Sequence, residues 1–156
     1  MKVANLLVQD MVLPDLESRE RDGVLREMVG FLKKSNRIGK EKELYEKLLQ
    51  REELGSTAIG DGVAIPHCKI KSVKDPLIML AISRRGVDFH SPDGSPSHIF
   101  FVVVSSPENP SLNLQILAAV AHLVRKADAL VERMLGSRDA ASLVDIIREE
   151  ENRINE

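Results

Sequence analysis

Six consecutive aliphatic or aromatic residues, Ile99 to Val104, form the longest such run in the chain. A run of this length without alternating polar residues is typical of a strand that is buried on both faces of a sheet. Two further apolar runs, Val63 to Ile65 and Leu77 to Ile82, also have the length of strands. The chain is therefore expected to build a sheet that other elements cover.

Apolar residues at helical spacing occur before and after these runs. They predict helices over residues 24–32 (with Ser18 as a cap), 44–51, 111–126, 127–135 and 139–147, the last followed by a frayed charged tail. Val12 to Leu16, around Pro14, predicts an edge strand. From this order we expect an α/β fold in one domain over residues 1–156, with a single mixed sheet flanked by helices on both faces.

The composition disfavours several classes of function. Aromatic residues make up 3% of the chain and the net charge is −2, which disfavours nucleic-acid binding. The single cysteine, Cys68, cannot form an internal disulfide, which indicates a reducing compartment. The amino-terminal apolar stretch is too short for a signal peptide, and no run is long enough to span a membrane. The sequence therefore predicts a cytoplasmic protein without membrane insertion.

The segment from Gly55 to His67, GSTAIGDGVAIPH, carries the densest set of functional residue types. Its glycines allow a loop to turn backbone N–H groups toward one point. Pro66 is expected to stop the strand that precedes it, so that His67 stands at a strand end beside this loop. This arrangement would hold an imidazole next to an anion.

Common phosphate and metal templates do not match this segment. Asp61 and Gly62 follow Gly60, where a Walker A loop needs Lys and then Ser or Thr, and no third glycine completes a dinucleotide fingerprint. A serine nucleophile elbow is also absent. The spacing of the four histidines predicts no metal site; they are His67, His90, His98 and His122.

Three residues have both a structural and a functional interpretation. His67 is either a hydrogen-bonded residue after a strand or a reactive imidazole. Arg51 is either a solvated charge at a helix end or a fork for phosphate oxygens, with Ser56 and Thr57 as further donors. Asn113 lies in the first turn of the helix predicted over residues 111–126, on its buried face. It is either a helix cap or a hydrogen-bond partner within a site. His122 lies opposite that face and is expected at the surface.

The stretch from Arg51 to His67, REELGSTAIGDGVAIPH, resembles the active-site signature of enzyme IIA domains of the mannitol/fructose type. These domains belong to the bacterial phosphoenolpyruvate phosphotransferase system, and the family includes the nitrogen-regulatory IIA proteins. The resemblance implies that His67 accepts a phosphoryl group from an HPr-like phosphocarrier, through Nε2 and without metal or organic cofactor. It also implies that Arg51 helps to hold the phosphoryl oxygens; Ser56, Thr57, Gly60 and Gly62 are expected to contribute to phosphate binding.

Two positions depart from the family pattern. Asn113 stands where family members usually carry a second histidine, and it can donate a hydrogen bond but cannot carry a positive charge. Cys68 stands where the family usually has glycine, and its side chain is expected to narrow the approach to His67. The expected function is phosphoryl transfer onward to a sugar-transport IIB domain. The alternative is a regulatory module whose phosphorylation state switches the binding of target proteins, and a third possibility is a family fold that has lost its chemistry.

Overall fold

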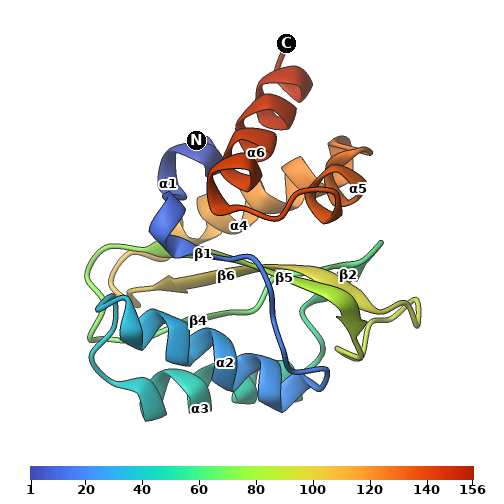
Figure 1. Cartoon of the computed structure of the whole chain (residues 1–156). Helices are drawn as coiled ribbons and strands as arrows, with labels where there is room; N and C mark the ends of the chain where they lie inside the picture. The colour runs from blue at the N-terminus through green and yellow to red at the C-terminus, as the bar shows by residue number, and fades with distance from the viewer.

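The strands form one mixed sheet in the computed structural model, which describes residues 1–156 (Figure 1). The order across the sheet is β1-β5-β6-β3-β2, and β4 also pairs with β6. The long pair β5 and β6 is antiparallel, whereas β3 and β4 run parallel to β6. The strands are β1 (Val12–Leu13), β2 (Ala58–Gly60), β3 (Val63–Ala64), β4 (His67–Lys69), β5 (Leu77–Val87) and β6 (Ser97–Ser105).

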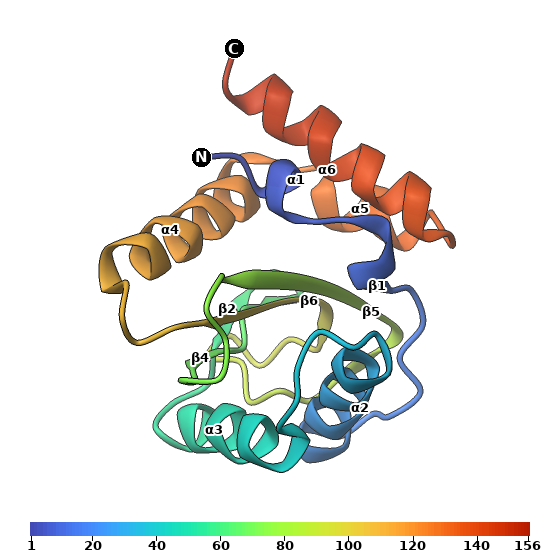
Figure 2. The same ribbon diagram turned by 90° about the vertical axis from the view of Figure 1, so that its left-hand side faces the viewer.

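Helices cover both faces of this sheet, as the sequence predicted (Figures 1 and 2). On one face lie α2 (Arg21–Lys34) and α3 (Glu41–Glu53). The other face carries α1 (Val3–Leu6), α4 (Pro110–Lys126), α5 (Leu130–Leu135) and α6 (Ala140–Ile154), and a short 3-10 helix, η1 (Gln9–Met11), leads into β1. No helix combines the length and the apolar character that crossing a membrane requires.

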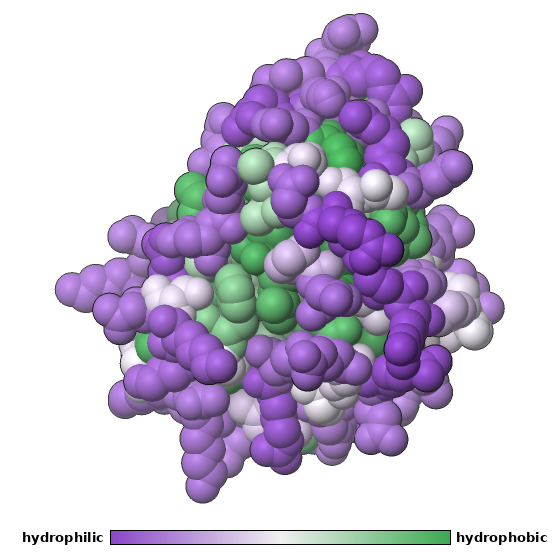
Figure 3. Space-filling view, viewed as in Figure 1, coloured by the Kyte–Doolittle hydropathy of each residue, from purple (hydrophilic) through white to green (hydrophobic).

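The central strand β6 is buried on both sides, because its side chains alternate between the two helical layers. Phe100, Phe101 and Val102 are each fully buried. The buried hydrophobic residues form one continuous cluster that includes residues of both layers. Hydrophilic residues cover most of the face seen in Figure 3, and hydrophobic residues show mainly across its middle, between the helical layers. The run from Ile99 to Val104 is therefore the central strand that its composition indicated.

The structure corrects two sequence predictions at helix ends. Ser18 does not cap α2, because the helix begins at Arg21 after Glu20, whose side chain makes no capping hydrogen bond. Ser18 packs instead against Gly23, where a Cβ atom would come within 2.1 Å of the serine Oγ. The carboxy-terminal tail is not frayed, since α6 continues to Ile154.

Two buried glutamates hold this last part of α6. Glu151 accepts hydrogen bonds from the backbone N–H groups of Val3, at 2.6 Å, and Ala4, at 3.0 Å. Glu150 accepts hydrogen bonds from Arg133 and Arg153. Glu151 thus ties the amino-terminal segment to α6, although the two segments lie almost 150 residues apart in the chain.

The strands β3 and β4 are two parts of one interrupted strand. Val63 lies opposite Ile99 and His67 lies opposite Val103, so both parts keep the same register with β6. Pro66 has no N–H group and breaks the ladder, but pairing resumes at His67. Pro66 therefore interrupts the strand, as predicted, but does not end it.

Candidate phosphoryl-transfer site

The His67 imidazole is fixed by a hydrogen bond to a residue in the break between β3 and β4. Its Nδ1 atom lies 2.7 Å from the carbonyl oxygen of Ile65. A carbonyl only accepts hydrogen bonds, so Nδ1 carries the proton and Nε2 keeps its lone pair. Nε2 has no partner within the chain, and since no buried side-chain nitrogen or oxygen is left unpaired, it is open to solvent. The ring therefore presents Nε2 as its nucleophilic atom.

The surroundings keep this imidazole neutral. Burial lowers the pKa of His67 below its ordinary value, the hydrogen bond to Ile65 opposes this shift, and the positive charges of Arg51 and Lys69 lower the pKa further. A neutral ring is the form that can attack an electrophile. The same two cations give the site a positive potential, which suits a phosphoryl group.

Arg51 lies in the last turn of α3 and donates a hydrogen bond from Nη1 to the carbonyl oxygen of Gly55, at 2.8 Å. It is half-buried and makes no ion pair with a carboxylate. Its positive charge lies close enough to His67 to lower the pKa of the imidazole. The structure thus brings Arg51 and His67 into one neighbourhood, with guanidinium donors that remain free for an anion.

The hydroxyl groups of Ser56 and Thr57 already have partners. Ser56 donates its hydroxyl hydrogen to the carbonyl oxygen of Phe89, at 2.5 Å, and accepts from the N–H of Ala58. Thr57 donates its hydroxyl hydrogen to Glu52, at 2.6 Å. A hydroxyl has one hydrogen to donate, so neither side chain can donate to a phosphoryl oxygen without losing an internal bond. This geometry does not support the expectation that they bind phosphate.

Gly60 and Gly62 lie away from His67. Both belong to the turn between β2 and β3, where Gly60, Asp61 and Gly62 all have positive φ angles, the region that glycine adopts most easily. The carbonyl oxygen of Gly62 accepts hydrogen bonds from the N–H groups of His98 and Ile99. Val103, opposite His67, is four residues further along β6, roughly 13 Å. The glycines therefore serve the turn, and the expectation that they form a phosphate cradle with His67 is not met.

Asn113 lies beyond the end of β6 that is nearer to His67. It is 4% exposed, and its Nδ2 donates to the carbonyl oxygen of Ser106, at 2.8 Å. The cap of α4 is Asn109, whose side chain accepts from the N–H of Leu112. The interpretation of Asn113 as a helix cap is therefore wrong. It ties the first turn of α4 to the strand end where Lys69 of β4 pairs with Ser105.

Cys68 and His122 make no contribution to the imidazole's immediate surroundings. Cys68 follows His67 in β4, so its side chain lies on the opposite face of the sheet, where Lys47 and Glu43 of α3 act on it. Burial raises the pKa of the Cys68 thiol to about 12, so the thiol stays protonated and unreactive. His122 is exposed on α4, as predicted.

Sequence reasoning missed Glu52, which connects to this site. The residue is 4% exposed, and its carboxylate accepts hydrogen bonds from the backbone N–H of Thr57, at 2.9 Å, and from the Thr57 hydroxyl. Burial raises the pKa of Glu52, and the bonds from Thr57 oppose that shift. A signal was present in the sequence, because Leu44, Leu48 and Glu52 recur every fourth residue on the buried face of α3.

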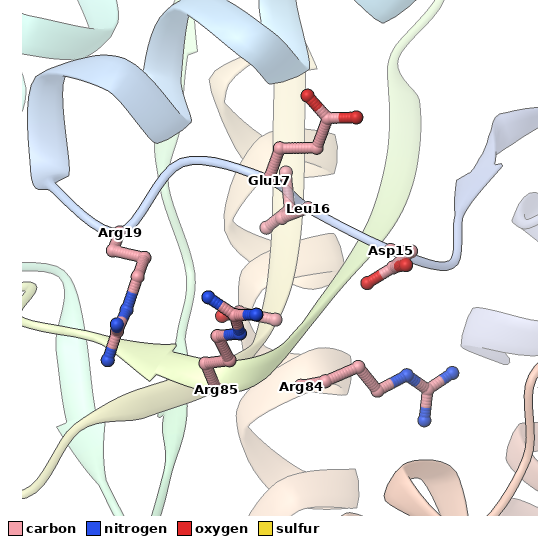
Figure 4. Close-up of a pocket in the computed structure, with 7 residues that line it drawn as sticks. Asp15, Leu16, Glu17, Arg19, Arg84 and Arg85 are labelled. Carbon is pink, nitrogen blue, oxygen red and sulfur yellow. The ribbon is translucent and has the colours of Figure 1, made fainter.

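A separate cleft of about 290 Å³ lies at the opposite end of β5 and β6 (Figure 4). One of its arginines, Arg84, points away from the others in this view and donates to the carbonyl oxygens of Leu135, Ser137 and Pro14. No residue of the His67 segment lines this cleft. The lining residues are Asp15, Leu16, Glu17, Arg19, Ser83, Arg84 and Arg85.

Comparisons with known sequences place the chain in a family. The family model of the phosphoenolpyruvate-dependent sugar phosphotransferase system, EIIA 2, matches residues 5–150. The fructose-specific EIIABC component of Bacillus subtilis is 32% identical over 149 residues, which are 96% of this chain and 23% of that protein. A nitrogen regulatory protein of Bradyrhizobium diazoefficiens is 32% identical over 148 residues, which are 94% of this chain and 95% of that protein.

Solved structures show the same relationship. The nitrogen regulatory protein IIA-Ntr from Neisseria meningitidis has a TM-score of 0.84 at 25% identity, over 93% of this chain and 98% of that one. IIA mannitol from Escherichia coli has a TM-score of 0.75 at 14% identity, over 90% of this chain and 98% of that one, which shows a shared fold. The resemblance inferred from the segment between Arg51 and His67 is confirmed: the chain belongs to the EIIA type 2 family of the phosphoenolpyruvate-dependent sugar phosphotransferase system.

Proposed function

We propose that His67 accepts a phosphoryl group on Nε2 from an HPr-like phosphocarrier and then passes it to a IIB-type domain. The observation that carries this proposal is the hydrogen bond from Nδ1 to Ile65, which leaves Nε2 as the free nitrogen of a neutral ring. Membership of the phosphotransferase family gives that nitrogen a phosphoryl donor. A IIA mannitol protein of Escherichia coli has been solved in complex with phosphorylated IIB mannitol, which supports a IIB domain as the acceptor.

The transfer is an in-line displacement at phosphorus. The lone pair of Nε2 forms the new nitrogen–phosphorus bond, and the bond from phosphorus to the donor's nitrogen breaks with its electron pair remaining on the donor. The His67 ring gains positive charge as the bond forms, and the Ile65 carbonyl stabilises this charge through the Nδ1 proton. Arg51 stabilises the phosphoryl oxygens. Asn113 fixes the adjoining turn of α4 through Ser106.

A labelling experiment tests this function. The protein is incubated with radiolabelled phosphoenolpyruvate, enzyme I and HPr, and acid-labile phosphate on the chain is measured. We expect label on the wild type and on His122→Ala, which changes an exposed histidine of α4, and none on His67→Ala. Equal label on His67→Ala, or none on the wild type with an active donor system, would refute the proposal.

A regulatory output is a second candidate. The nitrogen regulatory relative and the fructose-specific relative are equally identical to this chain, at 32%. The fold match to IIA-Ntr, with a TM-score of 0.84 against 0.75 for IIA mannitol, favours the regulatory branch. A phosphoryl group adds about two negative charges and can switch a docking surface. Transfer of label to a fructose-type IIB domain would support sugar transport, whereas partners that bind only one phosphorylation state would support regulation.

A further inference from the structure

A continuous chain of hydrogen bonds joins α3 to the His67 ring. Glu52 accepts from both the N–H and the hydroxyl of Thr57, at 2.9 and 2.6 Å. The carbonyl oxygen of Thr57 accepts from the N–H of Ile65, at 3.0 Å. The carbonyl oxygen of Ile65 then accepts from Nδ1 of His67, at 2.7 Å. Four residues of the segment between the end of α3 and β4 are thus fixed relative to one another.

The interruption between β3 and β4 makes the last bond possible. The carbonyl oxygen of Pro66 accepts from the N–H of Val103 in the sheet, at 2.9 Å. No backbone N–H group bonds to the carbonyl oxygen of Ile65, so this oxygen remains available for the imidazole. The direction of that carbonyl depends on how residue 65 is held, and the bond from its N–H to Thr57 is the contact that holds it on the side away from β6.

We propose that Glu52 is a positioning residue for His67, which acts through Thr57 and Ile65 to keep the proton on Nδ1 and to aim Nε2 outward. The inference rests on the proposed function for its effect on transfer, but its effect on the ring can be measured without any transfer. Both carboxylate oxygens bond to one residue, Thr57, so the loop between α3 and β2 has a single orientation. Without these bonds, Thr57 and then Ile65 lose their fixed positions.

In this proposal Glu52 acts through its hydrogen bonds to Thr57 and not through its negative charge. Substitutions at this position can separate the two effects. A glutamine at this position keeps one acceptor oxygen for the Thr57 N–H, and its amide can donate to the Thr57 hydroxyl oxygen. Glu52→Gln therefore preserves both contacts and removes the charge. Glu52→Leu removes both contacts and replaces the carboxylate side chain with an apolar one of similar size. Thr57→Val removes only the hydroxyl bond.

The experiment compares these variants by two measurements. Nitrogen-15 NMR of the unphosphorylated protein reports which ring nitrogen of His67 carries the proton, and initial labelling by phosphorylated HPr reports the transfer rate. For Glu52→Leu we expect a ring that populates both tautomers and a rate about tenfold to a hundredfold lower. Thr57→Val should fall between this variant and the wild type. Glu52→Gln should keep the wild-type tautomer and a rate within about threefold of wild type.

Glu151→Leu is the matched control, because Glu151 is another buried carboxylate that accepts two hydrogen bonds, but from α1. It should leave the tautomer and the rate unchanged. A wild-type tautomer in folded Glu52→Leu, or a Glu52→Gln variant as impaired as Glu52→Leu, would overturn the proposal. If Glu52→Leu does not fold, a wild-type tautomer in Thr57→Val overturns it. If wild type takes no label but the tautomer follows these variants, the proposed function fails while the positioning role stands.

Discussion

Glu52 and Glu151 are buried to nearly the same degree, 4% and 3% exposed, and each accepts two hydrogen bonds that include backbone N–H groups. The difference between them lies in what their partners are connected to. The partners of Glu151 belong to α1, whereas the partner of Glu52 is connected through Ile65 to the His67 imidazole, the proposed phosphoryl acceptor. A buried carboxylate is therefore not a sign of function by itself, and the path that leads from its partners decides what it does.

Among substitutions near the His67 site, to which Glu52 is connected, Arg51→Ala should lower the rate of phosphoryl acceptance most. Removing a donor that stabilises transferred charge is expected to lower the rate of phosphoryl acceptance about a hundredfold, or about 2.7 kcal/mol. Initial rates with phosphorylated HPr measure it. Arg51→Lys keeps the charge and loses the planar guanidinium, so its rate should lie between those of wild type and Arg51→Ala. A rate for Arg51→Ala within twofold of wild type would remove Arg51 from the site.

Glu151→Leu should change stability and leave the chemistry unchanged. The substitution leaves the N–H groups of Val3 and Ala4 without a partner in a buried region, which is expected to cost about 2 kcal/mol. Urea unfolding measures this cost, and amide exchange should rise first in α1. A wild-type free energy of unfolding would show that α1 is held by its apolar contacts alone.

The pH dependence of acceptance should follow His67. Its pKa in the folded protein lies below the ordinary value of 6.5, so the neutral ring persists below pH 6.5 and the rate then falls about tenfold per pH unit. The folded state binds fewer protons at this group than the unfolded chain, so its contribution to stability is lost as pH falls from 6.5 through the folded pKa. Arg51→Ala removes a nearby positive charge and should raise this pKa, whereas Glu151→Leu should not change it. NMR titration of the His67 ring measures this pKa. A value at or above 6.5 in wild type would contradict the burial of the ring.

Ser56→Ala should have the smallest effect. It removes the hydrogen bond to the Phe89 carbonyl and the one from the Ala58 N–H, with an expected cost of about 1 to 2 kcal/mol in stability and a rate change of less than about threefold. Thermal unfolding and initial labelling rates measure the two quantities. A rate loss near that of Arg51→Ala would instead place the Ser56 hydroxyl on the phosphoryl group.

The large elements could be predicted from the sequence, because the runs in β5 and β6 and the patterns in α2, α3, α4 and α6 depend on local periodicity. The short strands β2 and β4 could not, since pairing with β3 and β6 holds them in place. The buried position of Glu151 depends on partners almost 150 residues away, whereas the burial of Glu52 follows the helical spacing of Leu44 and Leu48. At the site, the segment from Arg51 to His67 predicts roles for both of these residues, and those roles stay predictions. The internal hydrogen bonds of Ser56 and Gly62 could not be foreseen, because their partners Phe89 and His98 lie elsewhere in the chain.

The shared register of β3 and β4 fixes the length of the segment that joins them. Both pair with β6 at one constant offset, across the break at Ile65 and Pro66. Successive side chains of a strand point to opposite faces, so one inserted or deleted residue would turn the imidazole toward α3, the side on which the Cys68 thiol now lies. The number of residues between the two short strands thus selects the face of the sheet on which the proposed phosphoryl acceptor lies, and insertions are expected to be tolerated in the turn at Gly94 but not here.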